Sequence, residues 1–415
     1  MPQSIHTFRL DNGLTVVVEP MPYVRSVAWT LLLHAGSAND PAGQSGAAQL
    51  LNGMVFRGAG ERDARALSNA LDELGVQRSG GVGTEYTTFS GALLAEDFDA
   101  ALALYADVVR RPHLPPAELD AVRALTLQSI QSLNDNPVQR LFNEFNKIYF
   151  PGPFGRSTLG EPDELDQIDP AALQADHAAR YRPAGGVLAI AGGVEPEQAR
   201  DTAERLFGDW QGAPPTWPQP QARSGPLYHH LQQETAQTQI AVAYQSLPLG
   251  DPHYYHERLA LNVLSGSMAS RLFTEVRVKR GLVYTVYATP RLYRGLGLVL
   301  GYAGTQPGRA QETVEVILGE LRRLGEGVTA EELNRARTGL LSALVMQGES
   351  STARAAALAG DVFLIDRPRT LEDIRGAVEA VTIDALNEYL AQHTPQTFTV
   401  ITLGPAPIDL NNHQE

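Results

Sequence analysis

The two halves of this 415-residue chain repeat one another, and the repeat limits the possible folds more than any other feature. A shift of about 213 residues aligns Val187–Ala191 with Val400–Gly404, and a shift of about 214 aligns Glu118 and Leu119 with Glu332 and Leu333. Two copies of one structural unit explain both alignments with a single loop deletion. The chain is therefore expected to use one domain fold twice.

A segment rich in proline and other turn-forming residues separates the two halves. It covers residues 208–226 and reads GDWQGAPPTWPQPQARSGP. Because proline lacks a backbone N–H and fixes φ, such a segment is incompatible with a packed helix or strand. The sequence predicts an N-terminal domain at 1–207, a linker at 208–226 and a C-terminal domain at 227–415.

Strands and long helices are predicted to follow one another in the same order in each half. Strands are expected where β-branched and apolar residues cluster, at 15–19, 26–33, 87–94 and 187–191. Helices are expected from apolar periodicity and Pro or acidic starts at 46–56, 64–74, 97–111, 116–133, 170–181 and 331–346. The fold class is α+β, with two homologous sandwich domains, each a mostly antiparallel sheet covered by helices.

Composition excludes several classes of function. The net charge of −14 and the lack of a basic run argue against nucleic acid or an anionic membrane as a partner. The chain has no cysteine, so thiolate metal sites and a cysteine nucleophile are excluded. Neither a secretory signal nor a run of about 18 apolar residues is visible. These features predict a soluble, cytoplasmic protein.

The predicted helix at 46–56 carries the most informative motif. With the two residues that follow, it reads GAAQLLNGMVFRG. It resembles the zinc-binding helix of the pitrilysin/insulinase peptidases, G-x-A-H-x-x-E-H-M-x-F-x-G, a family that includes the mitochondrial processing peptidases. The resemblance extends to LDNGLTVVVEP near the start and to SRLFTEVRVKRGLVYTVYA in the second half. It implies a processing-peptidase-like fold for both domains.

The same alignment shows that the zinc-binding residues of the family are replaced in this chain. Gln49 and Gly53 stand at the two histidine positions, and Asn52 stands at the position of the general-base glutamate. The third ligand, a glutamate about 76 residues further on, corresponds to Ser129. Glycine has no donor atom, and amide and hydroxyl groups bind zinc poorly. No metal is therefore expected at this site.

Other candidate sites are weaker. His253 and His256 lie three residues apart and Glu257 follows them, a spacing that places metal ligands on one helix face, but a solvated helix start is the preferred interpretation. His229 and His230 are adjacent, and neighbouring strand residues point to opposite faces. The glycines at 295–301 resemble a dinucleotide-binding loop only superficially, and a tightly packed strand is predicted there.

The second half retains an arginine and a tyrosine that the family uses. Arg277 and Tyr284 match the family pattern R-x-x-x-G-L-x-Y. The resemblance implies that this pair holds a peptide carbonyl and stabilises its developing oxyanion, which suits an always-charged guanidinium and a phenol. The alternative is that Arg277 forms a salt bridge on a helix face and Tyr284 packs at a strand start.

The family's peptide-binding strand edge is also altered. Active relatives resemble G-x-x-x-N-A-x-T before this strand, whereas here Ser79 and Val82 replace the Asn and the Thr. Gly80 and Gly81 favour mobility over a fixed edge. Addition of a peptide strand beside the altered zinc positions is therefore expected to be weakened.

Two functions follow from the resemblance. The first is a non-catalytic, zinc-less subunit of a heterodimeric zinc metallopeptidase, in which a homologous partner holds the zinc and this chain contributes Arg277 and Tyr284 to a peptide substrate. The alternative is a structural scaffold that resembles the core proteins of respiratory complexes and has no role in proteolysis. A homodimer of the isolated chain is compatible with the first, because the face that meets the partner can also pair with itself.

Overall fold

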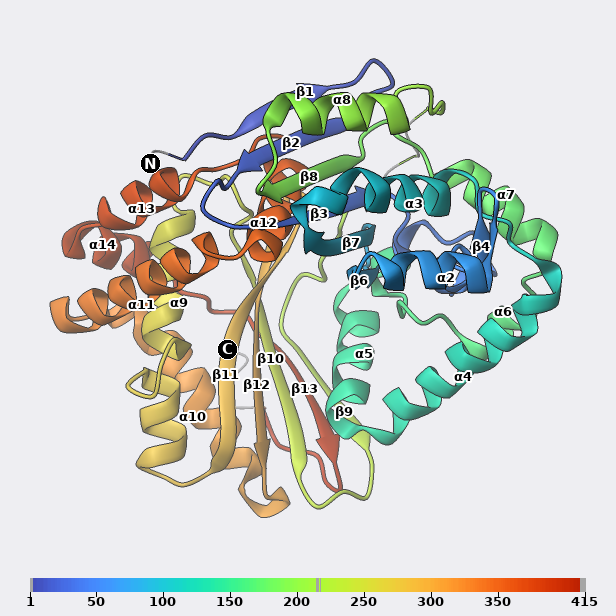
Figure 1. Cartoon of the computed structure of the whole chain (residues 1–415). Coiled ribbons are helices and arrows are strands. Elements are labelled where there is room, and N and C mark those ends of the chain that lie inside the picture. The colour runs from blue at the N-terminus through green and yellow to red at the C-terminus, as the bar shows by residue number, and fades with distance from the viewer. Residues whose placement is uncertain (1–2, 214–215, 217, 411–415) are drawn as a thin grey trace. The chain divides into compact units, whose positions relative to one another are not determined.

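The computed structural model describes residues 3–213, 216 and 218–410, which form two compact units (Figure 1). Unit 1 contains Met1–Ser132, Gly152–Gln219 and Gln347–Thr370, and unit 2 contains Leu133–Pro151, Pro220–Met346 and Leu371–Glu415. The predicted boundaries at 1–207, 208–226 and 227–415 differ from this division, because each unit includes a segment from the other half of the chain.

Unit 1 is built on a six-stranded sheet with the order β1-β2-β8-β3-β7-β6. All neighbouring strands are antiparallel except the parallel pair β2 and β8. The strands are β1 (His6–Arg9), β2 (Thr15–Pro20), β3 (Ser26–Leu33), β6 (Gln77–Val82), β7 (Thr87–Leu94) and β8 (Val187–Gly192). The four predicted strands are β2, β3, β7 and β8. A separate short hairpin joins β4 (Gly58–Ala59) to β5 (Arg62–Asp63).

The helices of unit 1 are α1 (Ala47–Met54), α2 (Ala64–Glu73), α3 (Phe98–Arg110), α4 (Leu119–Asp135, in unit 1 as far as Ser132), α6 (Pro162–Leu165), α7 (Pro170–Arg180), α8 (Pro196–Phe207) and α12 (Ser351–Ile365). Five of them, α1, α2, α3, α4 and α7, lie close to predicted ranges, and the other three, α6, α8 and α12, were not predicted. The central strands β3 and β8 are buried at every position except Ser26, because both faces of the sheet are covered. Trp29 and Leu31 share a core with α1 and α3, whereas Leu32 packs with α12.

Unit 2 repeats the topology of unit 1. Its five-stranded sheet has the order β11-β12-β10-β13-β9, and β13 and β9 form its parallel pair. The strands are β9 (Leu227–Gln232), β10 (Thr238–Ser246), β11 (Val283–Tyr293), β12 (Leu296–Thr305) and β13 (Thr399–Gly404). In chain order they correspond to β2, β3, β6, β7 and β8, so the two sheets share one spatial order. The predicted repeat and α+β class are confirmed. Strand β12 confirms the strand predicted over 295–301 except at Gly295, which lies in the turn before it.

The helices of unit 2 surround this sheet. They are α5 (Pro137–Tyr149), α9 (Tyr254–Ser265), α10 (Ala310–Arg323), α11 (Ala330–Gly348), α13 (Leu371–Glu379) and α14 (Ile383–His393). Helix α11 includes the predicted range 331–346, and its last two residues fall in unit 1.

Helices α5 and α12 account for the difference in domain boundaries. Helix α5 contacts β10 and β13 in unit 2, and α12 contacts β3 and β8 in unit 1. Asn136 begins α5: its side-chain oxygen accepts the N–H groups of Val138 and Gln139 at 3.0 and 3.2 Å. The turn before Pro137 therefore ends α4 and also starts a further helix.

The linker prediction is only partly testable. Residues 214, 215 and 217 of the predicted linker lie outside the described residues, and the described residues 211–213, 216 and 218–226 belong to no helix or strand. Across the described ranges, no helix combines the length and apolar character needed to cross a membrane.

Candidate functional site

Helix α1, which carries the altered zinc positions, is held at its N-terminus by a buried carboxylate. Asp40 accepts the N–H groups of Gly46 and Ala48 at 2.7 and 2.9 Å. Arg180 donates to Asp40 at 3.2 Å and also pairs with Asp176, and all three side chains are buried. Burial raises the pKa of Asp40, and Arg180 opposes this shift. The network fixes the start of α1 although the zinc ligands are missing.

Ser129 differs from the other three altered positions in its exposure to solvent. Gln49, Asn52 and Gly53 are half-buried on α1, whereas Ser129 is exposed on α4 and its hydroxyl donates to the Leu125 carbonyl at 2.9 Å. The buried side chains of α4 are Leu119, Val122, Thr126 and Ile130. The buried residue of α4 that lies nearest in sequence to position 129 is therefore Ile130, and its side chain also has no atom that can bind a metal.

Close packing of two helices fills the space that a side chain at position 53 would need. A Cβ atom built on Gly53 would lie 2.7 Å from Val122 Cγ1 of α4, and real Cβ atoms essentially never come within 3.0 Å of a neighbour. A ligand side chain at position 53 therefore does not fit this packing. In the described part of the chain, no group of three or more His, Cys, Asp or Glu residues is placed to hold a metal ion.

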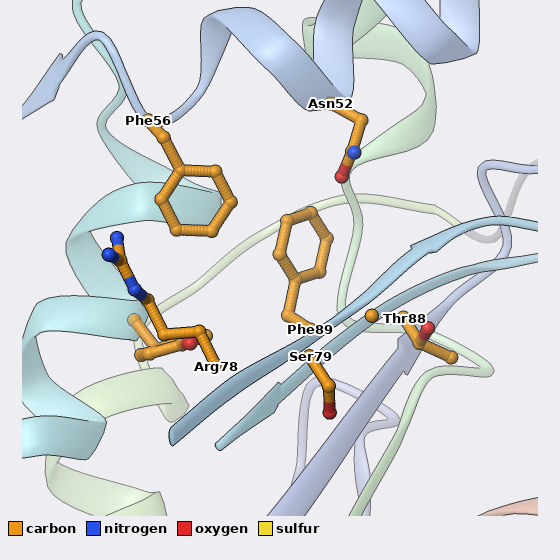
Figure 2. A pocket seen from close by; sticks show the side chains of 8 residues that line it. Asn52, Phe56, Arg78, Ser79, Thr88 and Phe89 are labelled. Atoms are coloured by element: carbon orange, nitrogen blue, oxygen red, sulfur yellow. The ribbon is translucent and has the colours of Figure 1, made fainter. Parts of the chain in front are cut away.

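A cavity of about 280 Å³ lies beside Asn52 (Figure 2). Its lining residues come from four elements and the turn after α1. They are Asn52 from α1, Phe56 from the turn, Arg78, Ser79 and Gly80 from β6, Thr88 and Phe89 from β7, and Tyr105 from α3. Sequence reasoning singled out Asn52 and Ser79 for other reasons but did not predict a cavity.

Strand β6 forms the edge of the sheet beside this cavity. It pairs with β7 over all six residues from Gln77 to Val82 without a register shift, and its first four residues are exposed. Gly80 has φ +129°, and a Cβ there would lie 2.3 Å from the Thr88 carbonyl oxygen. Gly80 thus allows close approach to β7 within a regular strand, whereas a Cβ at Gly81 would meet no atom within 4 Å. The mobility expected from these glycines stays a prediction.

The structure brings Arg277 and Tyr284 together in unit 2. Arg277 is the last residue but one of a π-helical segment, Phe273–Val278, and Tyr284 lies at the start of β11. The guanidinium carbon of Arg277 is 4.7 Å from the centre of the Tyr284 ring and 4.9 Å from that of Phe273. Tyr284 is 77% exposed. The pair therefore forms a cation–π stack at the surface, which neither the salt bridge nor the packing alternative describes.

The histidines at 253 and 256 lie at the start of α9, as predicted, but only His253 is exposed to solvent and His256 is half-buried. Their rings are 5.3 Å apart, and both lie near Tyr389 of α14. Burial lowers the pKa of His256, and His253 adds to this shift. The carboxylate of the adjacent Glu257 accepts a hydrogen bond from the backbone N–H of Leu247 at 3.0 Å.

Replacing Glu257 by glutamine is expected to stabilise the protein at neutral pH. Burial raises the pKa of Glu257 from 4.5 to about 6, so folding favours its protonated form. The parent therefore loses stability as the pH rises from 4.5 through about 6. Glu257→Gln, which keeps an acceptor oxygen, is expected to raise the free energy of unfolding by about 1–2 kcal/mol at neutral pH and to change it little near pH 4.

Urea denaturation across this pH range checks the prediction. Glu388→Gln, at an exposed position of α14, is the control and should leave the pH dependence unchanged. An equal effect of Glu257→Gln on the free energy of unfolding at both ends of the pH range would contradict the raised pKa of Glu257.

The chain is similar in sequence to zinc peptidases. The family model "Insulinase (Peptidase family M16)" matches residues 15–162, and "Peptidase M16 inactive domain" matches residues 167–340. An uncharacterized zinc protease of Mycobacterium leprae is 27% identical over 95% of this chain and 91% of its own length. The uncharacterized zinc protease YmxG of Bacillus subtilis is 26% identical over 97% of this chain and 98% of its own length.

Solved structures show the same fold. A peptidase M16 inactive domain from Pseudomonas fluorescens has a TM-score of 0.88 at 23% identity and covers 98% of this chain and 99% of that one. A protease from Helicobacter pylori has a TM-score of 0.89 at 18% identity, over 97% of this chain and 100% of that one. Together, the two family models and the shared topology identify the chain as a member of the insulinase (M16, pitrilysin-type) peptidase family.

Proposed function

We propose that this chain is the zinc-less subunit of a heterodimeric M16 peptidase. A homologous partner holds the zinc and cleaves the peptide, and this chain contributes Arg277 and Tyr284. The observation that carries the proposal is the surface stack, in which the guanidinium of Arg277 lies against the rings of Phe273 and Tyr284.

The geometry of the stack suits recognition of a carbonyl oxygen. The guanidinium carbon lies over the rings of Phe273 and Tyr284 at 4.9 and 4.7 Å. Ring contacts do not use up the five N–H groups of an arginine, which can donate hydrogen bonds to a carbonyl oxygen. Stacking also restricts a long side chain, so less conformational entropy is lost when a peptide binds. Donors fixed in advance near a developing oxyanion are the arrangement that stabilises the transition state of peptide hydrolysis.

The residues of helix α1 support the proposal that the zinc is held by the partner and not by this chain. Its positions 49, 52 and 53 carry neither a zinc ligand of the family type nor a carboxylate base, and Val122 fills the space beside Gly53. A scaffold role would require Arg277 and Tyr284 as packing residues. The high exposure of Tyr284 favours the peptidase role over that alternative.

Reconstitution with a homologue that carries an intact H-x-x-E-H motif tests the proposal. The mixture is expected to cleave a fluorogenic peptide that neither chain cleaves alone. Arg277→Gln and Tyr284→Phe should each lower kcat/KM of the mixture by about tenfold or more, since one oxyanion donor contributes at least that much. Arg335→Gln, at an exposed ion pair on α11, is the control.

Size-exclusion chromatography separates loss of assembly from loss of chemistry. The two variants should still form the heterodimer, because a single surface side chain is replaced in each. Equal activity of the zinc-bearing chain alone, or unchanged activity with both variants, would overturn the proposal.

A further inference from the structure

The sheet of unit 2 lacks one strand that the sheet of unit 1 has. In unit 1, β1 covers the outer edge of β2 as an antiparallel neighbour. Strand β9 is the counterpart of β2 in unit 2, and it lies at the end of its sheet beside β13. In the described part of the chain, no strand occupies the place beside β9 that β1 occupies beside β2.

The hydrogen bonds of β9 show which of its backbone groups face the open edge. The N–H groups of Leu227 and Gln233 donate to carbonyl groups just before β13 and at its end, at 3.2 and 3.0 Å. Because alternate residues of a strand bond to the same neighbour, the odd-numbered residues of β9 bond to β13. The N–H and C=O groups of Tyr228, His230 and Gln232 therefore face away from β13, and they have no hydrogen-bond partner among the described residues.

Strand β9 is also exposed, and it carries none of the usual protections of a sheet edge. Each of its six residues is at least partly exposed, whereas the four central residues of β2 are buried. Its sequence, LYHHLQ, contains no Lys, Asp, Glu or Pro, and its pairing with β13 has no register shift. Natural proteins use charges, prolines and bulges to keep such edges from pairing with another chain. The edge of β9 is therefore open to the addition of a strand.

We propose that β9 pairs with β9 of a second copy of this chain, as two antiparallel strands related by a twofold axis. With the axis at His230, Tyr228 lies opposite Gln232 of the second copy, and the open N–H and C=O groups of all three residues are paired. The opposed strands contain no acidic residue, lysine or arginine, so like charges do not meet although each chain has a net charge of −14.

A second copy fits this edge better than a different protein does. Selection of a foreign strand depends on pockets or charges that recognise its side chains, and β9 offers no charged residue for that purpose. A second copy needs no such selection, because the twofold axis itself sets the register and the same surface serves both chains.

This inference goes beyond the proposed function and is compatible with it. The sheet order β11-β12-β10-β13-β9 places β9 and β11 at opposite edges of the sheet (Figure 1). Tyr284 lies on β11, so pairing at β9 leaves the edge that carries Tyr284 accessible to a zinc-bearing partner. The pairing of two copies needs neither that partner nor the stack of Arg277 and Tyr284, so each proposal can fail without the other.

Sedimentation velocity of the full chain tests the proposal. A concentration-dependent dimer is expected, with a dissociation constant in the micromolar range, because a pair of six-residue strands is a small interface. Gln232→Pro removes one open N–H per copy and keeps the bonds to β13, so it should weaken the dimer by about tenfold or more. Gln232→Ala is the matched control, because it removes the same side chain and keeps the N–H.

A second pair of variants keeps the test valid if proline disturbs the strand itself. His230→Lys places two ammonium groups opposite each other at the axis, so it should also weaken the dimer, and added salt should partly restore it. His230→Gln is its control, because glutamine can keep a hydrogen bond to Thr402 Oγ1, which His230 Nδ1 contacts at 2.9 Å.

Disulfide cross-linking tests the register of the two strands, because the chain has no cysteine of its own. Opposed residues of a hydrogen-bonded antiparallel pair have Cα atoms about 5.5 Å apart, which suits a disulfide. His230→Cys should therefore give a covalent dimer under mild oxidation. Gln232→Cys is the control and should not, because four residues, about 14 Å along the strands, separate the two copies of position 232.

Three results would overturn the proposal. The first is a monomer at all concentrations. The second is a dimer that Gln232→Pro and His230→Lys leave unchanged, or that Gln232→Cys cross-links as well as His230→Cys does. The third is a chain that is monomeric alone but loses assembly with the zinc-bearing subunit on Gln232→Pro, since a different chain then occupies the edge.

Discussion

Replacing Arg354 by alanine is expected to lower the free energy of unfolding of unit 1 by about 3–5 kcal/mol, because the substitution leaves a buried carboxylate without its counter-ion. Arg354 lies on α12 and donates from Nε to Glu19 Oε2 of β2 at 2.8 Å. The two side chains are 1% and 4% exposed. Neither water nor another cation can easily replace the lost partner.

Guanidinium chloride denaturation followed by circular dichroism measures this effect. Arg375→Ala on α13 is the matched control, since its pair with Glu372 is exposed and should contribute little to stability. The double variant Arg354→Met with Glu19→Met should recover much of the loss, because it removes both charges together. If Arg354→Ala lowers the free energy of unfolding no more than Arg375→Ala does, the buried pair of Arg354 and Glu19 does not have the proposed importance for stability.

This ion pair also shows where sequence reasoning reached its limit. The strands β2, β3, β7 and β8 follow from local apolar patterns, and the repeat follows from internal similarity, so the α+β class could be predicted. Glu19 and Arg354 lie in opposite halves of the chain, and no local pattern indicates that they meet. Assigning α12 to unit 1 and α5 to unit 2 depends on such long-range contacts.

The candidate site was likewise predictable only in part. Aligning α1 with the family motif identified Gln49, Asn52 and Gly53 directly, because the motif is local. Counting residues to α4 gave Ser129, which the structure places on the exposed face. One residue rotates a helical side chain by about 100°, so a count with an error of one position changes the face. The cavity at Arg78 joins four elements, and its residues share no sequence pattern.

Restoring the four family residues is expected to fail to restore zinc binding while Val122 is present. The variant Gln49→His, Asn52→Glu, Gly53→His and Ile130→Glu supplies two imidazoles, a base and a third ligand from the buried face of α4. A histidine at position 53 would overlap with Val122, because a Cβ atom at position 53 would lie only 2.7 Å from Val122 Cγ1. Overpacking of this kind costs about 1–3 kcal/mol and displaces α1 from α4.

Adding Val122→Ala to the four substitutions should make room for the side chain at position 53. Metal analysis after dialysis against zinc is expected to find about one zinc per chain in the five-substitution variant and far less in the four-substitution variant. Two control variants, Gly53→Ala alone and Gly53→Ala combined with Val122→Ala, isolate the steric effect of Val122 on a side chain at position 53. Neither variant adds a zinc ligand. If the four-substitution variant already retains stoichiometric zinc, helix packing does not block the site, and the missing ligand atoms alone distinguish this chain from its zinc-binding relatives.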